Sequence, residues 1–328
     1  MNATLLRGLA AVATTTAMLA GAHAQSAAPG PVEQVDALNH VFGQHAGQRA
    51  SHAKGFCAAG AFTPDRQAAS LVHGPLFEQA KVPALLRFSI GGGNPAASDK
   101  SRSVRGLALR LSGGDETYDL VLISEPVFFA ATPASFVSFL DARVADPATR
   151  QPDPKKIAEH NARYPDGRTQ PALLAAHAAP ASYASTPYFS NNAFVFSNAA
   201  GKKQYARIVV EPDAGVHYLS ADEEKSQPDL FLEGELKNRL AKAPAGFTLF
   251  AQLPAAGDSL IDPSRQWSGS QRIALGKLTV STLADNGTCD PVVFMPLQLP
   301  TGIAGSDDPI LQARGGAYAV SLSRRLRK

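Results

Sequence analysis

The chain has 328 residues, of which 45% are hydrophobic, 7% aromatic and 18% charged, and its formal net charge is +3. This composition supplies enough apolar side chain for a folded core, which excludes a collagen-like repeat, a wholly disordered chain and a disulfide-knotted miniprotein. The 31 basic and 28 acidic side chains are scattered without a basic block, so the sequence carries no electrostatic footprint for nucleic acid.

Residues 1–24 have the pattern of a secretory signal. A basic residue near the start, Arg7, is followed by an apolar stretch, and the small residues Ala22 and Ala24 precede the predicted cleavage after residue 24. The alternative is an uncleaved membrane anchor, although this stretch is marginal for a bilayer core about 30 Å thick. We expect a periplasmic protein in a Gram-negative host, without membrane association once the signal is removed.

Residues 25–328 are predicted to form a single domain, because no internal repeat and no linker divides them. Runs of β-rich or alternating residues between turn-forming clusters are typical of antiparallel strands in a barrel or large sheet, and they lie at 85–90, 106–111, 117–123, 193–197, 205–211, 247–253 and 275–282. Helical patterns lie at 134–144, 154–161, 230–241 and 309–327. The mixture predicts an α+β fold.

Cys57 and Cys289 are the only cysteines, too few for a disulfide framework or a four-thiolate metal site. In an oxidising compartment they could form a disulfide, and the alternative is a pair of buried free thiols. The chain has no dinucleotide-binding glycine motif, no phosphate-binding loop, no His-Glu-x-x-His and no Cys-x-x-Cys-His for covalent haem. These absences leave scattered His, Arg and Tyr residues as the candidates for chemistry.

The predicted C-terminal helix carries one such group, and Asp308 followed by Pro309 is a good cap and first-turn pair for its start. Arg314, Tyr318 and Arg325 fall within about 40° of a common face of a helix with 3.6 residues per turn. A guanidinium one turn from a phenol favours the phenolate, and tyrosinate is an axial ligand of haem iron in some enzymes. The alternative is an arginine that stacks on a surface tyrosine.

Six fragments of the sequence occur in the order and approximate spacing of the haem catalases: Arg49-x-x-His52, Arg87-Phe88-Ser89, Val104-Arg105-Gly106, Asp119-Leu120-Val121, Pro126-Val127-Phe128-Phe129 and Arg314-x-x-x-Tyr318. The sequence therefore resembles the catalase-related peroxidases, a reduced version of the catalase fold, over residues 41–327. The resemblance implies an antiparallel β-barrel with flanking helices. It also implies haem b, bound non-covalently and buried between the barrel and the C-terminal helix that carries the tyrosine.

The resemblance further implies roles for single residues. His52 corresponds to the distal acid/base, and Ser89 to a hydroxyl that bonds to it. Tyr318 corresponds to the axial ligand of the haem iron, and Arg314 sustains its phenolate form. Three arginines and one aromatic ring complete the expected haem site: Arg49, Arg87 and Arg325 at the propionates, and Phe129 at the edge of the distal pocket.

The sequence departs from the catalase pattern at Ser124, two residues before Pro126, where catalases place an asparagine. A serine hydroxyl is shorter than the amide that positions the outer peroxide oxygen. We therefore expect a peroxidase that reduces H2O2 or organic hydroperoxides with a small organic reductant and has weak catalase activity. The chain ends ten residues after Tyr318, without the regions that support the tetramer of large catalases, so a monomer or homodimer is expected.

Two other functions remain open on the sequence. A fatty-acid hydroperoxide isomerase of the allene-oxide-synthase type shares the catalase fold, and Ser51 places a hydroxyl just before His52 where catalases have an apolar residue. A periplasmic haem carrier or sensor is the second alternative. A carrier has no need of His52, so the presence of His52 together with Ser89 favours catalysis.

Overall fold

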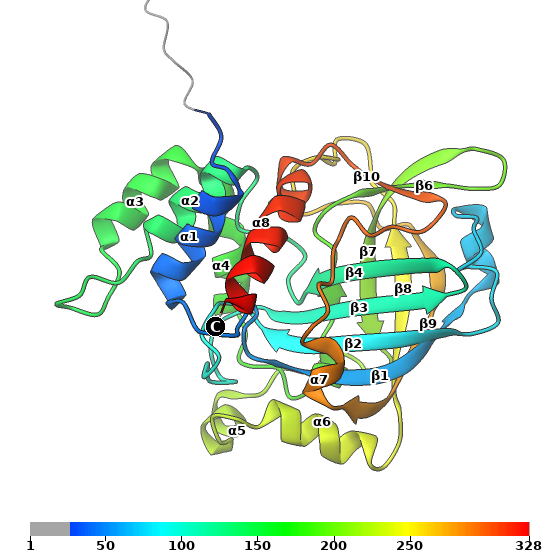
Figure 1. Cartoon of the computed structure of the whole chain (residues 1–328), viewed down its shortest axis with the longest axis horizontal. Helices are drawn as coiled ribbons and strands as arrows, with labels where there is room; N and C mark the ends of the chain where they lie inside the picture. Colours follow the sequence, from blue (N-terminus) through cyan, green and yellow to red (C-terminus); the bar gives the residue numbers. More distant parts are fainter. Residues whose placement is uncertain (1–26, 328) are drawn as a thin grey trace, which may run out of the picture.

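The computed structural model describes residues 27–327, and its centre is a closed antiparallel β-barrel of eight strands (Figure 1). In order around the barrel these are β1 (Gly55–Pro64), β2 (Val82–Ile90), β3 (Arg105–Gly113), β4 (Glu116–Ile123), β5 (Tyr188–Phe189), β7 (Lys203–Pro212), β8 (Ala245–Gln252) and β9 (Arg272–Ala284). The pairing of β9 with β1 closes the ring. Two short strands, β6 (Phe194–Ser197) and β10 (Ile303–Gly305), extend the edge of β7.

The barrel core follows from the period-two alternation of its strands. Along β8, buried residues alternate with half-buried ones, and Phe247 is fully buried between its neighbours. The register of the pairing between β1 and β9 shifts at Gly60, where the two strands approach closely. A Cβ atom at Gly60 would lie 2.0 Å from the carbonyl oxygen of Thr279, so only glycine permits this close approach.

The helices lie outside the barrel: α1 (Pro31–Phe42), α2 (Pro133–Asp141), α3 (Pro154–Arg163), α4 (Thr169–Ala175), α5 (Ala221–Ser226), α6 (Leu232–Leu240), α7 (Asn286–Cys289) and α8 (Pro309–Leu326). Short 3-10 turns occupy Arg66–Ser70, Pro165–Arg168 and Tyr183–Ser185. Helix α8 contacts α1 and α2, and Figure 1 shows it between these helices and the barrel. Within residues 27–327, no helix is long and apolar enough to cross a membrane.

The structure confirms the predicted fold class and barrel, and each expected strand and helix overlaps an observed one. The sequence pattern did not indicate β1, because its Ala- and Gly-rich residues carry little β propensity. It did not indicate α1 either, although Pro31 at the first helical position is a recognised start signal. The omission of α1 matters for function, because residues of this helix line the cavity described below.

Cys57 of β1 and Cys289 of α7 form a disulfide with a Cα–Cα distance of 5.8 Å, which settles the choice that the sequence left open. The bond fastens α7 to the outside of the barrel across 232 positions of sequence.

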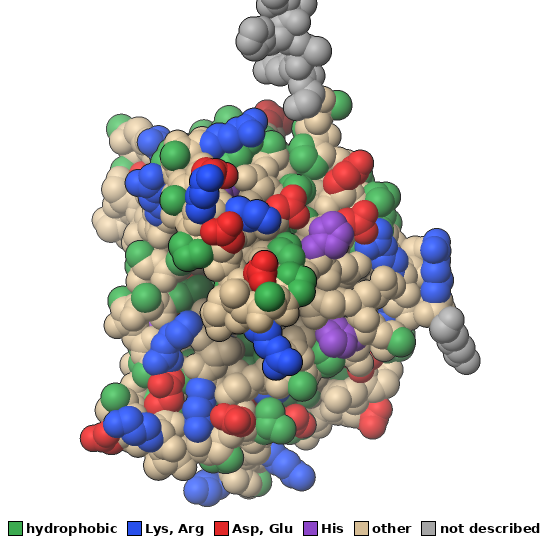
Figure 2. All heavy atoms as spheres, turned by 90° about the vertical axis from the view of Figure 1, so that its left-hand side faces the viewer, with side chains coloured by type: hydrophobic (Ala, Val, Ile, Leu, Met, Phe, Trp, Pro, Cys, Tyr) green, Lys and Arg blue, Asp and Glu red, His purple; other side chains and the backbone are tan. Residues whose placement is uncertain are grey.

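The predicted signal at 1–24 lies outside the described residues. Figure 2 shows the face at the left of Figure 1, where basic and acidic side chains are interspersed.

Candidate active site

A cavity of about 660 Å³ lies between the barrel strands β2 to β4 and the helices α1, α2 and α8. Its polar lining comes from segments far apart in the sequence, and six phenylalanines contribute to its aromatic wall. Eight of the nine predicted site residues line it: Arg49, His52, Arg87, Ser89, Phe129, Arg314, Tyr318 and Arg325. The cavity therefore occupies the place where the resemblance puts the cofactor.

The first group in the cavity is the pair of His52 and Ser89. His52 Nδ1 and Ser89 Oγ are 3.0 Å apart and share a hydrogen bond. The backbone of His52 is in the left-handed region, with φ of 55°, a conformation that costs about 1 kcal/mol or more for a residue with a side chain. Arg87 holds it there, because Nη1 donates to the His52 carbonyl at 2.8 Å and Nη2 donates to the Ala53 carbonyl at 3.0 Å.

Gly106 leaves the space that this pair needs. It is the second residue of β3 and pairs with Ser89 of β2. A Cβ atom at this position would lie 2.4 Å from Ser89 Oγ and 2.6 Å from His52 Nδ1. The space that the His52–Ser89 pair needs therefore explains why the Val104-Arg105-Gly106 fragment ends in glycine.

The environment of His52 favours its neutral form. Burial, followed by the positive charges of Arg87, Arg314 and Arg49, lowers the pKa of His52 to about 3. A neutral imidazole that donates from Nδ1 to Ser89 Oγ keeps Nε2 unprotonated. His52 can therefore accept a proton inside the cavity at neutral pH.

A hydrogen-bonded chain leads from the start of α8 to Tyr318. Asp308 caps the helix, and its Oδ2 accepts from Asn192 Nδ2 at 2.6 Å. Asn192 Oδ1 accepts from Arg314 Nη1 at 2.9 Å, and Arg314 Nη2 donates to Tyr318 Oη at 2.7 Å. The guanidinium is thus fixed on both sides, which keeps one of its donors on the phenol oxygen.

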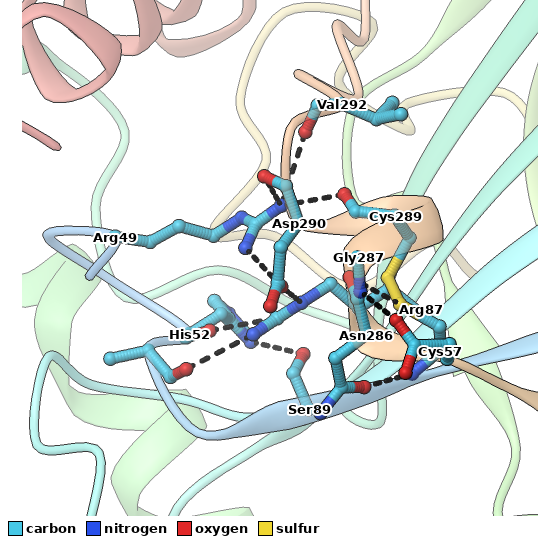
Figure 3. A network of polar contacts seen from close by, with 12 residues as sticks. Arg49, His52, Cys57, Arg87, Ser89, Asn286, Gly287, Cys289, Asp290 and Val292 are labelled. Atoms are coloured by element: carbon cyan, nitrogen blue, oxygen red, sulfur yellow. Dashed lines mark hydrogen bonds and ion pairs between the residues drawn. A yellow bond between two sulfur atoms is a disulfide. The ribbon is translucent and has the colours of Figure 1, made fainter. Parts of the chain in front are cut away.

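The cavity also contains a cluster of arginines around a single carboxylate, that of Asp290 (Figure 3). Arg49 Nη1 donates to Asp290 Oδ1 at 3.1 Å, and Arg87 Nε lies 3.6 Å from the same oxygen, where it has no hydrogen-bond partner. Burial and the nearby charges of Arg87 and Arg325 lower the pKa of Arg49 to about 10. One carboxylate thus faces three positive charges, so the cluster can accept further negative charge.

Three comparisons bear on the family. The catalase family model matches residues 13–328. The chain is 35% identical to a catalase-related peroxidase of Synechococcus elongatus over 90% of this chain and 89% of that protein. It is also 35% identical to a catalase-related peroxidase of Mycolicibacterium paratuberculosis over 90% of this chain and 94% of that protein.

The chain belongs to the catalase family. Membership makes it a haem enzyme of peroxide chemistry. Catalase A from Saccharomyces cerevisiae has the same fold, with a TM-score of 0.76 and 24% identity over 85% of this chain. A fungal catalase gives a TM-score of 0.77 with 23% identity over 86% of this chain. The chain spans about three fifths of the length of these two solved catalases.

Ser124 is the one predicted site residue that the structure does not bring to the cavity. Its hydroxyl accepts a hydrogen bond from the backbone N–H of Arg105 at 3.0 Å, and it borders a separate small pocket with His177. The preceding residue, Ile123, lines the main cavity. Ser124 lies just beyond the end of β4, where the hydrogen bond from Arg105 holds its hydroxyl outside the cavity.

Sequence reasoning missed the residues that hold the cations. Asp290 has no local motif. The disulfide at the preceding residue and the hydrogen bonds from Arg49 to the backbone around it bring it to Arg49 and Arg87. Asn192 follows Asn191 in a polar stretch without a recognisable pattern. Asp308 was identified as the helix cap, but its second oxygen also fixes the chain to Arg314.

Proposed function

We propose that this member of the catalase family is a haem-dependent peroxidase that reduces H2O2 or organic hydroperoxides with a small organic reductant and has weak catalase activity. The observation that carries the proposal is the His52–Ser89 pair in one cavity with Tyr318 and Arg314. Two relatives of nearly the same length carry the name catalase-related peroxidase, which supports the same conclusion.

The cavity has the donor set that haem b requires. Tyr318 supplies an oxygen ligand for iron, and the cluster of Arg49, Arg87 and Arg325 suits the two carboxylates of the porphyrin. The Nε of Arg87 is buried without a hydrogen-bond partner, which supports the binding of a further anion beside it. Both cysteines are used in the disulfide, which leaves no thiol for a covalent link and supports non-covalent binding of the haem.

When bound, the haem supplies the redox chemistry that cleaves the O–O bond. His52 Nε2 takes the proton from the hydroperoxide and returns it to the departing oxygen, while Ser89 keeps the ring oriented. Arg314 stabilises negative charge on Tyr318. Overall, one hydroperoxide, two protons and two electrons from the reductant give one alcohol, or water in the case of H2O2, and one water.

The end of β4 supports weak dismutation of H2O2. The cavity is lined there by Ile123, whose side chain offers no hydrogen bond. The nearby amides of Gln170, Asn191 and Asn192 are each held in place by a hydrogen bond from the side-chain NH2 to a protein acceptor. The second H2O2, whose two-electron oxidation completes dismutation, therefore lacks an amide at the position where catalases place one.

The test compares the protein with two variants of matched type. The purified haem protein should oxidise a phenolic reductant with H2O2 or cumene hydroperoxide, and oxygen release from H2O2 alone should be slower. Tyr318→Phe should alter or abolish the ferric haem spectrum, whereas Tyr164→Phe, which changes a half-buried tyrosine outside the cavity, should not. A protein that takes up no haem, or that releases oxygen faster than it oxidises the reductant, would overturn the proposal.

Fatty-acid hydroperoxide isomerase is a second candidate, because Ser51 lines the cavity beside His52. Product analysis separates the two reactions. A peroxidase consumes reductant and yields the alcohol. The alternative enzyme needs no reductant, and its product is either a rearranged compound of the same mass or an allene oxide formed with loss of one water.

We also propose that the protein is exported to the periplasm as a monomer or homodimer. The signal-like pattern of residues 1–24 supports export, and so does the disulfide, since disulfides persist in oxidising compartments. Amino-terminal sequencing of the fractionated protein should find Gln25 first. Mass measurement by light scattering should give one or two chains, and a tetramer or a cytoplasmic uncut chain would contradict these proposals.

A further inference from the structure

Arg143 is a cation of the cavity that the haem site described above does not use. It follows the end of α2 and is half-buried in the cavity wall. Its Nη1 donates to the carbonyl of Phe139 at 2.9 Å, and its guanidinium carbon lies 3.4 Å from the centre of the Phe139 ring. Burial lowers the pKa of Arg143, so the surroundings disfavour the charge without supplying a counter-charge.

Three other arginines of the cavity have a carboxylate beside them. Arg49 and Arg87 share Asp290, and Arg102 pairs with Glu224. Arg314 and Arg325 form no ion pair within residues 27–327 either, but the proposed haem site already uses them, at Tyr318 and at the propionates. Arg143 has no carboxylate within 4.0 Å among residues 27–327. A guanidinium has five N–H donors in a planar fork, and one backbone bond leaves most of them available to a ligand.

The wall around Arg143 is apolar. Phe129 lies 4.4 Å from Phe139 and 5.3 Å from Phe136, measured between ring centres, and 4.4 Å from Phe128. All four rings line the cavity. A ligand that fits this wall and its cation has a hydrocarbon or aryl body and a carboxylate.

We propose that Arg143 binds the carboxylate of an organic hydroperoxide with an apolar body, such as a fatty-acid hydroperoxide, while His52 receives its hydroperoxide group. This inference rests on the proposed peroxidase function and names its substrate class. Arg143 would form a bidentate pair with the carboxylate, and the phenylalanine wall would cover the body of the molecule.

The test uses the haem protein and the variants Arg143→Met and Arg143→Lys. Arg163→Met is the matched control, because Arg163 also lies over an aromatic ring, 5.2 Å from the centre of Tyr164, but does not line the cavity. Calorimetry should show that dodecanoate binds more tightly than dodecan-1-ol. Arg143→Met should weaken dodecanoate binding about 10- to 100-fold, as expected for a hydrogen-bonded charge pair, with Arg143→Lys between it and the parent.

Steady-state kinetics supply the second readout. With a fatty-acid hydroperoxide, Arg143→Met should raise KM about tenfold or more while kcat stays within a factor of two. With the neutral cumene hydroperoxide, neither parameter should change, and Arg163→Met should match the parent throughout.

Three results would overturn the inference: equal dodecanoate binding in the parent and Arg143→Met, a KM change only for a carboxylated reductant, or loss of haem from Arg143→Met. The last result would assign Arg143 to the cofactor. If no hydroperoxide is turned over by any variant, the proposed function fails, while dodecanoate binding still decides whether Arg143 is an anion site.

Discussion

The packing of Gly106 against the His52–Ser89 pair leads to a sharp prediction. The substitution Gly106→Ala adds one methyl group, whose carbon would lie 2.4 Å from Ser89 Oγ and 2.6 Å from His52 Nδ1. Ordinary contacts of this kind are about 3.5 to 4.0 Å. The imidazole must therefore move by roughly 1 Å, and the 3.0 Å hydrogen bond between His52 and Ser89 cannot persist unchanged.

The magnitude follows from what this displacement does to proton transfer. A misplacement of about 1 Å at a reacting group costs on the order of 100-fold in rate, equivalent to about 2.7 kcal/mol of transition-state stabilisation. Overpacking should also lower the free energy of unfolding by about 1 to 3 kcal/mol. We expect kcat/KM for hydroperoxide reduction to fall about 100-fold while the haem spectrum keeps its tyrosinate character, because Tyr318 lies outside the contact.

The assay is reductant oxidation with cumene hydroperoxide, accompanied by urea unfolding of each protein. The matched control is Gly234→Ala in α6, where an added Cβ would meet nothing within 4 Å. This control should leave kcat/KM unchanged and raise the free energy of unfolding by about 0.5 to 1 kcal/mol. The double variant Gly106→Ala/Ser89→Ala removes the nearest of the three clashing atoms, so its loss should be smaller than the sum of the single losses. A Gly106→Ala protein with kcat/KM within threefold of the parent would refute the reasoning.

The lowered pKa of His52, about 3 against an ordinary 6.5, makes stability depend on pH. Below pH 6.5 the unfolded chain binds a proton at His52 that the folded chain resists until near pH 3, so the free energy of unfolding falls across this window. When the pH falls from 7 to 4.5, the free energy of unfolding measured with urea should therefore decrease by about 2 kcal/mol more in the parent than in His52→Gln. Equal decreases would contradict the lowered pKa of His52. The disulfide should contribute about 2 to 5 kcal/mol, so dithiothreitol should lower the Tm of the parent by several degrees and leave the Tm of a Cys57→Ser/Cys289→Ser variant unchanged. Because Asp290 follows Cys289, reduction should also speed haem transfer to an apo-acceptor, and an unchanged transfer rate would show that Asp290 holds its position without the bond.

The sequence was informative where a residue's role is local. Period-two alternation identified most barrel strands, and the Asp308 cap identified the start of α8. The spacing of Arg314 and Tyr318 predicted their contact, which the structure confirms at 2.7 Å. The two residues share one helix, so their relative position follows from helix geometry alone.

Tertiary structure decided what depends on segments distant in the chain. Ile123 and Ser124 are adjacent, and only the course of the chain at the end of β4 determines which of them reaches the cavity. Asp290 serves Arg49 and Arg87 across more than 200 positions because a disulfide and the barrel surface bring them together.

The sequence by itself thus determined the family, the barrel and most of the residues that face the cavity, because motifs and periodicity are properties of neighbouring residues. Only the folded chain showed that Asn192 and Asp308 fix Arg314, and that Gly106 makes room for His52. It alone showed that Arg143 lies without a counter-charge beside an aromatic wall. Contacts of this kind depend on where whole elements pack, and a single sequence does not encode that placement in any local pattern.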